Sequence, residues 1–354
     1  MINRINSLRK KLDDFQAIIV TSPSNRIYLT GFRSSAGTIF ITKNSASFFI
    51  DFRYFEKAKN VITDLNVVLS SNLYSEINEI IDKENIKEIY VETANTTVLE
   101  FGLLSKHINA TILSDDTINS HIMKMRSIKN DKELSLIKKA QFFTDETFNY
   151  ILSRIEKGRT EKDIMLDLEF FLRKMGAERV SFNSIVVAGK NTSLPHGTPG
   201  DYTIQNGDFI TMDFGAIYGG YCSDMTRTVA VGKISEEQEF VYKTVLRAQS
   251  EAIKSILPGK VCKDIDSVAR NIIYNEGFEG CFGHSLGHSI GIDVHESPGF
   301  STRCNDLLET GMVITVEPGI YIENKFGVRI EDMIVVTQNG CENLTHSPKN
   351  LIIV

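Results

Sequence analysis

The sequence has few cysteines, no long apolar run and no excess of positive charge, and each absence excludes a class of protein. A membrane-spanning helix needs about 20 consecutive apolar residues, and no apolar stretch of the 354-residue chain approaches that length. The first residues, MINRINSLRKKLDDF, contain no apolar segment typical of a signal peptide. The five cysteines form no Cys-x-x-Cys pair, which favours reduced thiols in a cytoplasmic protein over a disulfide framework.

The charge and the glycine pattern limit the function further. A net charge of −6 gives no electrostatic case for nucleic-acid binding. Residues 1–120 contain no glycine fingerprint of a nucleotide-binding unit, and no part of the chain is of low complexity. These observations predict a protein that binds neither a membrane nor a nucleic acid.

The length predicts two domains, because 354 residues exceed the usual size of one. A basic and polar stretch, HIMKMRSIKNDKE (121–133), precedes a strongly periodic helix that begins near Asp131. We therefore expect one domain in residues 1–125 and a second in residues 126–354.

Residues 1–125 alternate short apolar runs with helical stretches, which indicates an α/β domain with a mixed or mostly parallel sheet. The runs that predict strands are AIIV (17–20), TIFIT (38–42), ASFFID (46–51), NVVLS (66–70) and EIYVE (88–92). The stretches that predict helices are RYFEKAKNVI (53–62) and SEINEIIDKEN (75–85).

The second domain contains an internal repeat. KGRTEKDIMLDLEFFLRKMGAE (157–178) aligns with PGKVCKDIDSVARNIIYNEGFE (258–279), and each block predicts a helix closed by a glycine, Gly176 or Gly277. NGDFITMDFG (206–215) aligns in the same way with TGMVITVEPG (310–319). The two offsets are nearly equal, which predicts a duplicated half-domain.

The repeat places acidic residues in two equivalent apolar hairpins. DFITMDFGAIYGGYCSDMTRTVAVG (208–232) predicts a hairpin around Tyr-Gly-Gly-Tyr, with Asp213 and Asp224 on its arms. VITVEPGIYIENKFGVRIEDMIVV (313–336) predicts a second hairpin around Asn324-Lys325, with Glu317 and Glu331 on its arms. Since Asp213 aligns with Glu317, both halves carry an acid at the same place in an apolar strand.

Four gathered carboxylates repel one another, and only Arg227 and Arg329 lie close to them in sequence. Any one acid could instead point to solvent, as most do. Three histidines in the intervening stretch GHSLGHSIGIDVHE (283–296) favour a metal site. Four carboxylates and one imidazole favour Mn²⁺ or Co²⁺, with Zn²⁺ or Fe²⁺ as alternatives, and two ions sharing an activated hydroxide indicate hydrolysis of an amide or ester.

In their order along the chain, LPHG, MDFGAIYGGYCSDMTRT, GHSLGHSIGIDVHE, TVEPGIY and GVRIED resemble the metallopeptidases with the pita-bread fold. This family includes methionine aminopeptidase, aminopeptidase P, prolidase and creatinase. NRIYLTGFRSSAGTIFIT and FFIDFRYFEKA are similar to the creatinase-type N-terminal domain, so the resemblance covers nearly the whole chain. It implies a creatinase-like α/β domain followed by an α+β pita-bread catalytic domain with a pseudo-two-fold internal duplication.

The resemblance also implies a set of metal ligands and a nucleophile. The ligands would be Asp213, Asp224, His288, Glu317 and Glu331, with Asp224 and Glu331 bridging two divalent ions. Mn²⁺ is the most favoured ion, and a hydroxide between the two ions would attack the substrate. Glu317 would also accept a proton from the attacking water.

Five other residues take roles from the same resemblance. They are His196, His284, His295, Tyr321 and Arg329. His196 and His295 would place the substrate and stabilise the developing oxyanion, and His284 would lie near the proline pocket. A structural role remains open for His284 and His295, a salt bridge to Asp224 or Glu331 for Arg329, and a core position for Tyr321.

The implied activity is hydrolysis of the Xaa-Pro bond at the N-terminus of peptides, as in aminopeptidase P, with a prolidase acting on dipeptides as the alternative. Phe182 and Phe282 are candidates to line the proline pocket, and Arg303 is a candidate clamp for a dipeptide carboxylate or an exposed loop residue. A proline-containing peptide is the expected partner, and a homodimer is the expected assembly. The rival hypothesis is a non-catalytic binding module of the same fold.

Overall fold

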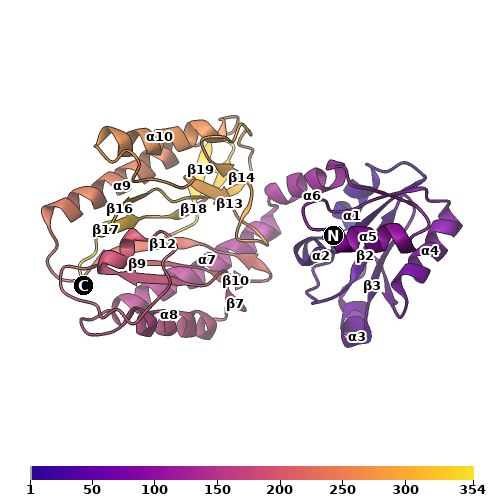
Figure 1. Ribbon diagram of the computed structural model, residues 1–354, viewed down its shortest axis with the longest axis horizontal. Coiled ribbons are helices and arrows are strands. Elements are labelled where there is room, and N and C mark those ends of the chain that lie inside the picture. The colour runs from indigo at the N-terminus through magenta and orange to yellow at the C-terminus, as the bar shows by residue number, and fades with distance from the viewer. Residues whose placement is uncertain (1) are drawn as a thin grey trace. The chain divides into compact units, whose positions relative to one another are not determined.

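The computed structural model describes residues 2–354 and divides into two compact units, the first ending at Arg126 and the second beginning at Ser127 (Figure 1). The expected boundary after residue 125 falls in helix α6 (Thr117–Ser127). Among the described residues, no helix is both long enough and apolar enough to cross a bilayer.

The first unit contains one six-stranded mixed sheet. In spatial order the strands are β4 (Asn66–Leu69), β3 (Ala46–Ile50), β2 (Thr38–Thr42), β1 (Gln16–Val20), β5 (Glu88–Tyr90) and β6 (Thr111–Leu113). The pairs β1–β2 and β2–β3 are antiparallel and the other pairs are parallel. Every residue of β1 is buried, because apolar strands at the centre of a sheet are covered on both faces.

The helices of this unit complete the predicted α/β arrangement. Besides α6 they are α1 (Ile2–Arg9), α2 (Pro23–Thr30), α3 (Phe52–Val61), α4 (Leu73–Glu84) and α5 (Val98–His107). The five strands and two helices predicted from the sequence are confirmed, and so is the mixed sheet.

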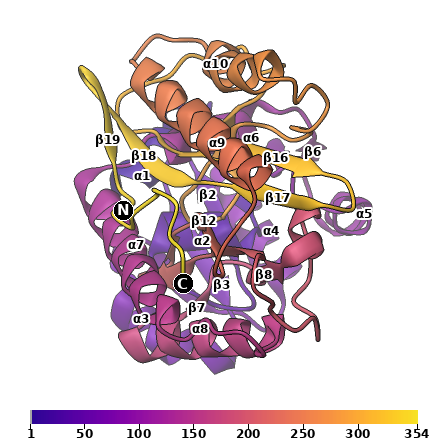
Figure 2. The same cartoon turned by 90° about the vertical axis from the view of Figure 1, so that its left-hand side faces the viewer.

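The second unit places two helices on each side of its strands (Figures 1 and 2). On one side lie α7 (Asp131–Leu152) and α8 (Glu161–Met175), and on the other lie α9 (Glu236–Ser255) and α10 (Cys262–Asn275). Gly176 ends α8 at φ 112°, and Gly277 follows α10 at φ 88°. These backbone conformations favour glycine, which confirms the two predicted helix ends.

The strands of the second unit form two antiparallel sheets extended by two hairpins. One sheet has the order β12 (Met225–Ala230), β9 (Phe209–Phe214), β8 (Ile185–Ala188), and the other has the order β14 (Glu296–Phe300), β13 (Gly287–Ser289), β15 (Val313–Val316), β18 (Asp332–Thr337), β19 (Gly340–Asn343). The first hairpin is β10 (Ala216–Tyr218) with β11 (Tyr221–Cys222), beside β7 (Arg179–Val180), and the second is β16 (Gly319–Ile322) with β17 (Phe326–Arg329).

The predicted duplication is visible in this order of elements. In the first half β9 and β12 enclose the hairpin β10–β11, and in the second half β15 and β18 enclose β16–β17. Gly219 and Gly220 form the first turn at φ 57° and 82°, and Asn324 lies in the second at φ 59°. Both hairpins stand where the sequence predicts them.

Each half of this unit has its own apolar core. Phe148 of α7, Leu168 of α8 and Met212 of β9 are fully buried in one core. Val245 of α9 and Ile334 of β18 belong to a separate core, which also includes residues of α10. Because side chains alternate along a strand, the neighbours of these core residues face the other side of their strands. On β9, that alternation directs Asp213, the neighbour of Met212, away from this apolar core.

Candidate metal and catalytic site

Nine of the ten predicted site residues line one cavity of about 800 Å³ in the second unit. They are Asp213, Asp224, His288, Glu317, Glu331, His196, His284, His295 and Arg329. Tyr321 is the tenth, and its hydroxyl contacts His284 and Arg329 from behind the cavity wall. The fold therefore gathers residues that are up to 135 positions apart in the sequence.

The four acids occupy similar but not identical places on their strands. Asp213 lies within β9, where it pairs with Thr226 and Ile185. Asp224, Glu317 and Glu331 each lie one residue outside a strand. The prediction that all of them lie inside strands is therefore wrong for three, because the chain passes from one sheet to a hairpin, or back, at these positions.

The predicted ligand atoms converge. His288 Nε2 lies 3.5 Å from Asp224 Oδ2 and 3.4 Å from Glu317 Oε1. One ligand atom each from Asp224, His288 and Glu331 lies within 4.8 Å of the others. His288 Nδ1 donates to the Ser289 carbonyl at 3.1 Å, which leaves the Nε2 lone pair toward the carboxylates.

Several buried oxygens in this cluster have no protein partner. Among the described residues, Asp213 Oδ1, Asp224 Oδ1 and Glu331 Oε1 are buried and accept no hydrogen bond. Buried polar atoms are nearly always paired in folded proteins, so three orphaned carboxylate oxygens around one imidazole need another partner. A divalent cation satisfies that need, and the donor set of carboxylates and imidazole suits it chemically.

The electrostatics of the cluster support the same conclusion. Burial, together with the neighbouring carboxylates, raises the pKa of Asp224 and of Glu331 well above their ordinary values. Burial also raises the pKa of Glu317 to about 8 and lowers the pKa of His288 to about 4, so the imidazole is neutral. A cation favours the charged form of each carboxyl group and reverses these upward shifts. The residues therefore fit a divalent metal.

Arg329 of the second half bonds to Asp213 of the first half, and Thr226 of the first half bonds to Glu331 of the second. Arg329 Nη2 donates to Asp213 Oδ2 at 2.7 Å, and its Nε donates to Thr226 Oγ1 at 3.0 Å. Thr226 Oγ1 in turn donates to Glu331 Oε2 at 2.8 Å. The arginine is 4% exposed. It bonds to Asp213, whereas the sequence suggested a salt bridge to Asp224 or Glu331.

His284 and Tyr321 belong to one chain of hydrogen bonds. His284 Nδ1 donates to the Ser285 carbonyl at 2.8 Å, which makes Nε2 the acceptor for the Tyr321 hydroxyl at 2.9 Å. Arg329 Nη1 donates to the same hydroxyl at 2.8 Å. Both nitrogens of His284 are thus engaged by the protein, and Tyr321 links the histidine to the arginine.

The two remaining histidines have different surroundings. The ring of His295 packs edge-on against His288, with ring centroids 4.3 Å apart. His196 lies on a loop whose two ends are bound by the buried carboxylate of Glu161. Oε1 of Glu161 accepts from the Ala188 amide at 2.7 Å, and Oε2 accepts from the Gly200 amide at 2.8 Å.

The two candidate phenylalanines and the candidate clamp lie in different places. Phe182 lines the cavity. Phe282 is 1% exposed and packs edge-on against His284, with centroids 5.0 Å apart, so its predicted place in the pocket lining is wrong. Arg303 is exposed in its loop and is not part of the lining, which agrees with the alternative considered for it.

The sequence pattern of metallopeptidase family M24 matches residues 135–338, which is more than half of the chain. The chain belongs to this metallopeptidase family. The pattern of the creatinase/prolidase N-terminal domain matches residues 4–128. The predicted family, the creatinase-type first domain and the pita-bread catalytic domain are confirmed.

Similar proteins match this M24 chain over both of its domains. A Xaa-Pro dipeptidase of Pyrococcus horikoshii is 36% identical over 357 residues, which cover 98% of this chain and 99% of that protein. The structure of a Xaa-Pro dipeptidase from Bacillus anthracis matches with a TM-score of 0.96 and 38% identity, covering 100% and 99% of the two chains. An X-Pro aminopeptidase from Thermotoga maritima matches with a TM-score of 0.90 and 35% identity, covering 98% and 99%.

The sequence did not point to several supporting residues of the M24 site. Thr315 Oγ1 donates to Glu317 Oε1 at 3.3 Å and accepts from the His288 amide at 3.0 Å. Thr226 Oγ1 likewise donates to Glu331 Oε2. Thr226 lies two residues after Asp224, and Thr315 lies two residues before Glu317. The two-residue period of a strand is therefore a signal that could have identified both threonines.

Proposed function

We propose that the protein is a metal-dependent exopeptidase that hydrolyses the Xaa-Pro bond at the N-terminus of peptides. The observation that carries this proposal is the group of three orphaned carboxylate oxygens beside the neutral His288, at the wall of a cavity large enough for a short peptide. The names of the two similar dipeptidases and of the similar aminopeptidase support the Xaa-Pro class.

Five residues, Asp213, Asp224, His288, Glu317 and Glu331, would hold two divalent metal ions. Divalent metal bound there, most favourably Mn²⁺, supplies Lewis acidity and lowers the pKa of water. Glu317 lies beside His288 in the cavity wall and is the proposed acceptor of the proton that the attacking water loses. Thr315 orients this carboxylate through its hydroxyl.

Three histidines are proposed to act on the substrate or on its surroundings. His196 and His295 line the cavity and are the proposed donors to the carbonyl oxygen as negative charge develops on it. His284 is bonded on both nitrogens, so its proposed role is to form the wall through Tyr321 and Arg329. A proline after the cleaved bond has no N–H and a fixed φ, so the site needs no acceptor for that amide.

The geometry favours an aminopeptidase that accepts peptides longer than two residues. Among the described residues that line the cavity, Arg329 is the single lysine or arginine, and its guanidinium is already bonded to Asp213 and Tyr321. A lysine or arginine free to bind the substrate's carboxylate would favour a dipeptidase, and Arg303, the candidate for that role, lies outside the lining. The dipeptidase names of two relatives support prolidase activity as the second candidate. The homodimer and the cytoplasmic location stay predictions.

The test is a peptidase assay on the full chain, stripped of metal with a chelator and then supplied with Mn²⁺. We expect hydrolysis of an Xaa-Pro-Xaa tripeptide to appear with Mn²⁺, to be faster than that of the Xaa-Pro dipeptide, and to disappear in Glu317→Ala. Glu323→Gln is the matched control, because Glu323 is an exposed carboxylate in the turn between β16 and β17.

Two results would contradict the proposal at different levels. Faster hydrolysis of the dipeptide would show that the protein is a prolidase and not an aminopeptidase. No hydrolysis with Mn²⁺, Co²⁺, Zn²⁺ or Fe²⁺, together with a Glu317→Ala variant that behaves like the parent, would support the rival hypothesis of a non-catalytic binding module.

A further inference from the structure

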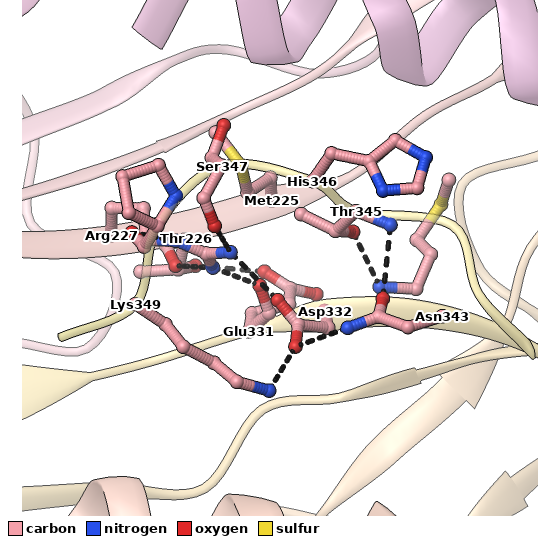
Figure 3. Close-up of polar contacts among 12 residues, drawn as sticks. Met225, Thr226, Arg227, Glu331, Asp332, Asn343, Thr345, His346, Ser347 and Lys349 are labelled. Carbon is pink, nitrogen blue, oxygen red and sulfur yellow. Dashed lines mark hydrogen bonds and ion pairs between the residues drawn. The ribbon is translucent and has the colours of Figure 1, made fainter. Parts of the chain in front are cut away.

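A buried arginine–aspartate pair, Arg227 and Asp332, lies next to Thr226 and Glu331 and is not part of the cavity lining (Figure 3). Arg227 follows Thr226 on β12, and Asp332 follows Glu331 at the start of β18. Since side chains alternate between the two faces of a strand, Thr226 and Glu331 meet on the cavity side while Arg227 and Asp332 meet on the other. The Nη2–Oδ1 distance is 2.7 Å, and the two side chains are 1% and 0% exposed.

Every N–H of the Arg227 guanidinium has an acceptor. The five acceptors are Asp332 Oδ1 and the backbone carbonyl oxygens of Thr226, Glu331, Ser347 and Pro348. Five donors in a rigid planar fork hold their partners in one arrangement. One of those partners is the backbone of Glu331, a proposed metal ligand.

The second oxygen of Asp332 extends the network to three more side chains. Asp332 Oδ2 accepts from Gln249 at 2.9 Å, from Asn343 at 2.8 Å and from Lys349 at 2.6 Å. Two cationic side chains, those of Arg227 and Lys349, therefore contact the Asp332 carboxylate. A buried network in which each member is bonded is rigid.

The network also fixes residues 345–354, the C-terminal segment. Asp145 on α7 accepts from the amides of His346 and Ser347 at 3.1 Å and 2.9 Å. Farther on, Val354 donates to the Ala230 carbonyl at 2.9 Å, and the Ala230 amide donates to the Ile352 carbonyl at 2.9 Å. The segment is therefore held by α7 at His346 and Ser347 and by β12 at Ile352 and Val354.

We propose that Arg227 is a positioning residue for Glu331, and that the C-terminal segment, acting through Arg227 and Asp332, strengthens divalent-metal binding in the cavity. This rests on the proposed function, since it takes Glu331 as a metal ligand. Glu331 Oε2 is bonded to Thr226, so the place of the free Oε1 depends on the backbone that Arg227 holds. Residues that orient ligands from behind typically change metal affinity by about 10–100-fold.

The experiment measures the Kd for Mn²⁺ of the full chain by competition with a chelating dye, together with thermal unfolding of the metal-free protein. Three variants weaken the network to different extents: Arg227→Lys keeps the charge with fewer donors, Asp332→Asn removes the charge at constant shape, and Lys349→Met removes one donor. We expect the Kd to rise about 10–100-fold in the first two and less in Lys349→Met.

Glu161→Gln is the matched control. Glu161 is a fully buried carboxylate of the same unit, and its bonds go to Ala188, Asn191 and Gly200 rather than to a proposed ligand. We expect this variant to lower the unfolding temperature while the Kd for Mn²⁺ stays that of the parent. A purely structural network would lower stability in all four variants and leave the Kd unchanged in each.

The outcomes separate this inference from the proposed function. A parent that binds no divalent metal would overturn both. A parent that binds Mn²⁺, with folded variants whose Kd equals that of the parent, would overturn the inference alone, and so would an equal loss of affinity in Glu161→Gln. If Arg227→Lys does not fold, Asp332→Asn and Lys349→Met decide the question.

Discussion

The two halves of the second unit repeat one arrangement of strands, yet each half bonds to a carboxylate of the other. Asp213 belongs to the first half, and Arg329 of the second half bonds to it at 2.7 Å. Glu331 belongs to the second half, and Thr226 of the first half bonds to it at 2.8 Å. Arg227 and Asp332 cross the same junction on the opposite face. The comparison teaches that a duplicated fold produces a site at the junction of its copies, where each copy supports the ligands of the other.

The equivalence of the two halves predicts equal losses of activity when each half loses one proposed metal ligand. In Asp224→Asn and in Glu331→Gln, we expect kcat/KM to fall about 10³-fold or more, because several kcal/mol of metal-assisted stabilisation are lost. The metal-free variants should unfold at the same or a higher temperature, since each removes a carboxyl group whose pKa is raised by burial and by its neighbours. Steady-state assays with saturating Mn²⁺ and calorimetry measure both effects. A large loss confined to one of the two variants would contradict the equivalence.

The two supports across the junction should differ in strength. Arg329 bonds to Asp213 and Tyr321 and is buried, whereas Thr226 offers Glu331 a single hydroxyl. We expect kcat/KM to fall about 100-fold in Arg329→Gln and about 10-fold in Thr226→Val, at the two ends of the range known for residues that orient metal ligands. Titration of both variants with Mn²⁺ distinguishes weaker metal binding from slower chemistry. A larger loss in Thr226→Val would reverse the proposed order.

Two aligned glycines, Gly215 and Gly319, sharpen the comparison because they are needed for different reasons. A Cβ at Gly215 would lie 1.9 Å from the backbone oxygen of Ser223, whereas a Cβ at Gly319 would lie 2.5 Å from the Tyr321 hydroxyl. We expect Gly215→Ala to destabilise the protein by about 3 kcal/mol and Gly319→Ala by about 1 kcal/mol, because a side chain moves more easily than a backbone. Gly319→Ala should instead lower kcat by displacing that hydroxyl. Denaturant unfolding and kinetics of both variants test this, and equal loss of stability would contradict it.

The smallest expected effect is on the pH dependence of the metal-free protein. Burial raises the pKa of Glu317 to about 8, above the value of about 4.3 in an unfolded chain. The folded state therefore binds this proton more tightly, and the resulting stability is complete below the unfolded pKa and is lost as the pH rises through about 8. We expect the unfolding temperature in chelator to fall over this range and the fall to be smaller with Mn²⁺. A flat profile in chelator would contradict the raised pKa.

Much of the fold could be predicted because its signals are local. The apolar runs at 17–20 and 38–42 became β1 and β2, and the glycine pair 219–220 became a two-residue turn. The aligned acids could be predicted to gather because equal strand patterns imply equal strand arrangements. The face on which each neighbour lies could not be predicted: Arg227, the arginine closest in sequence to Asp224, points away from the cavity to Asp332.

The sequence by itself determined the two domains' element types and the duplication, and its resemblance to the metallopeptidases implied nine of the residues that line the cavity. The element types and the duplication follow from periodicity and composition, which act over a few residues at a time. The tertiary structure alone decided which half supports which carboxylate, that Tyr321 bonds to His284 and Arg329, and that Phe282 lies behind His284. These contacts join residues far apart in the chain, and they depend on how two sheets pack, which no local pattern encodes.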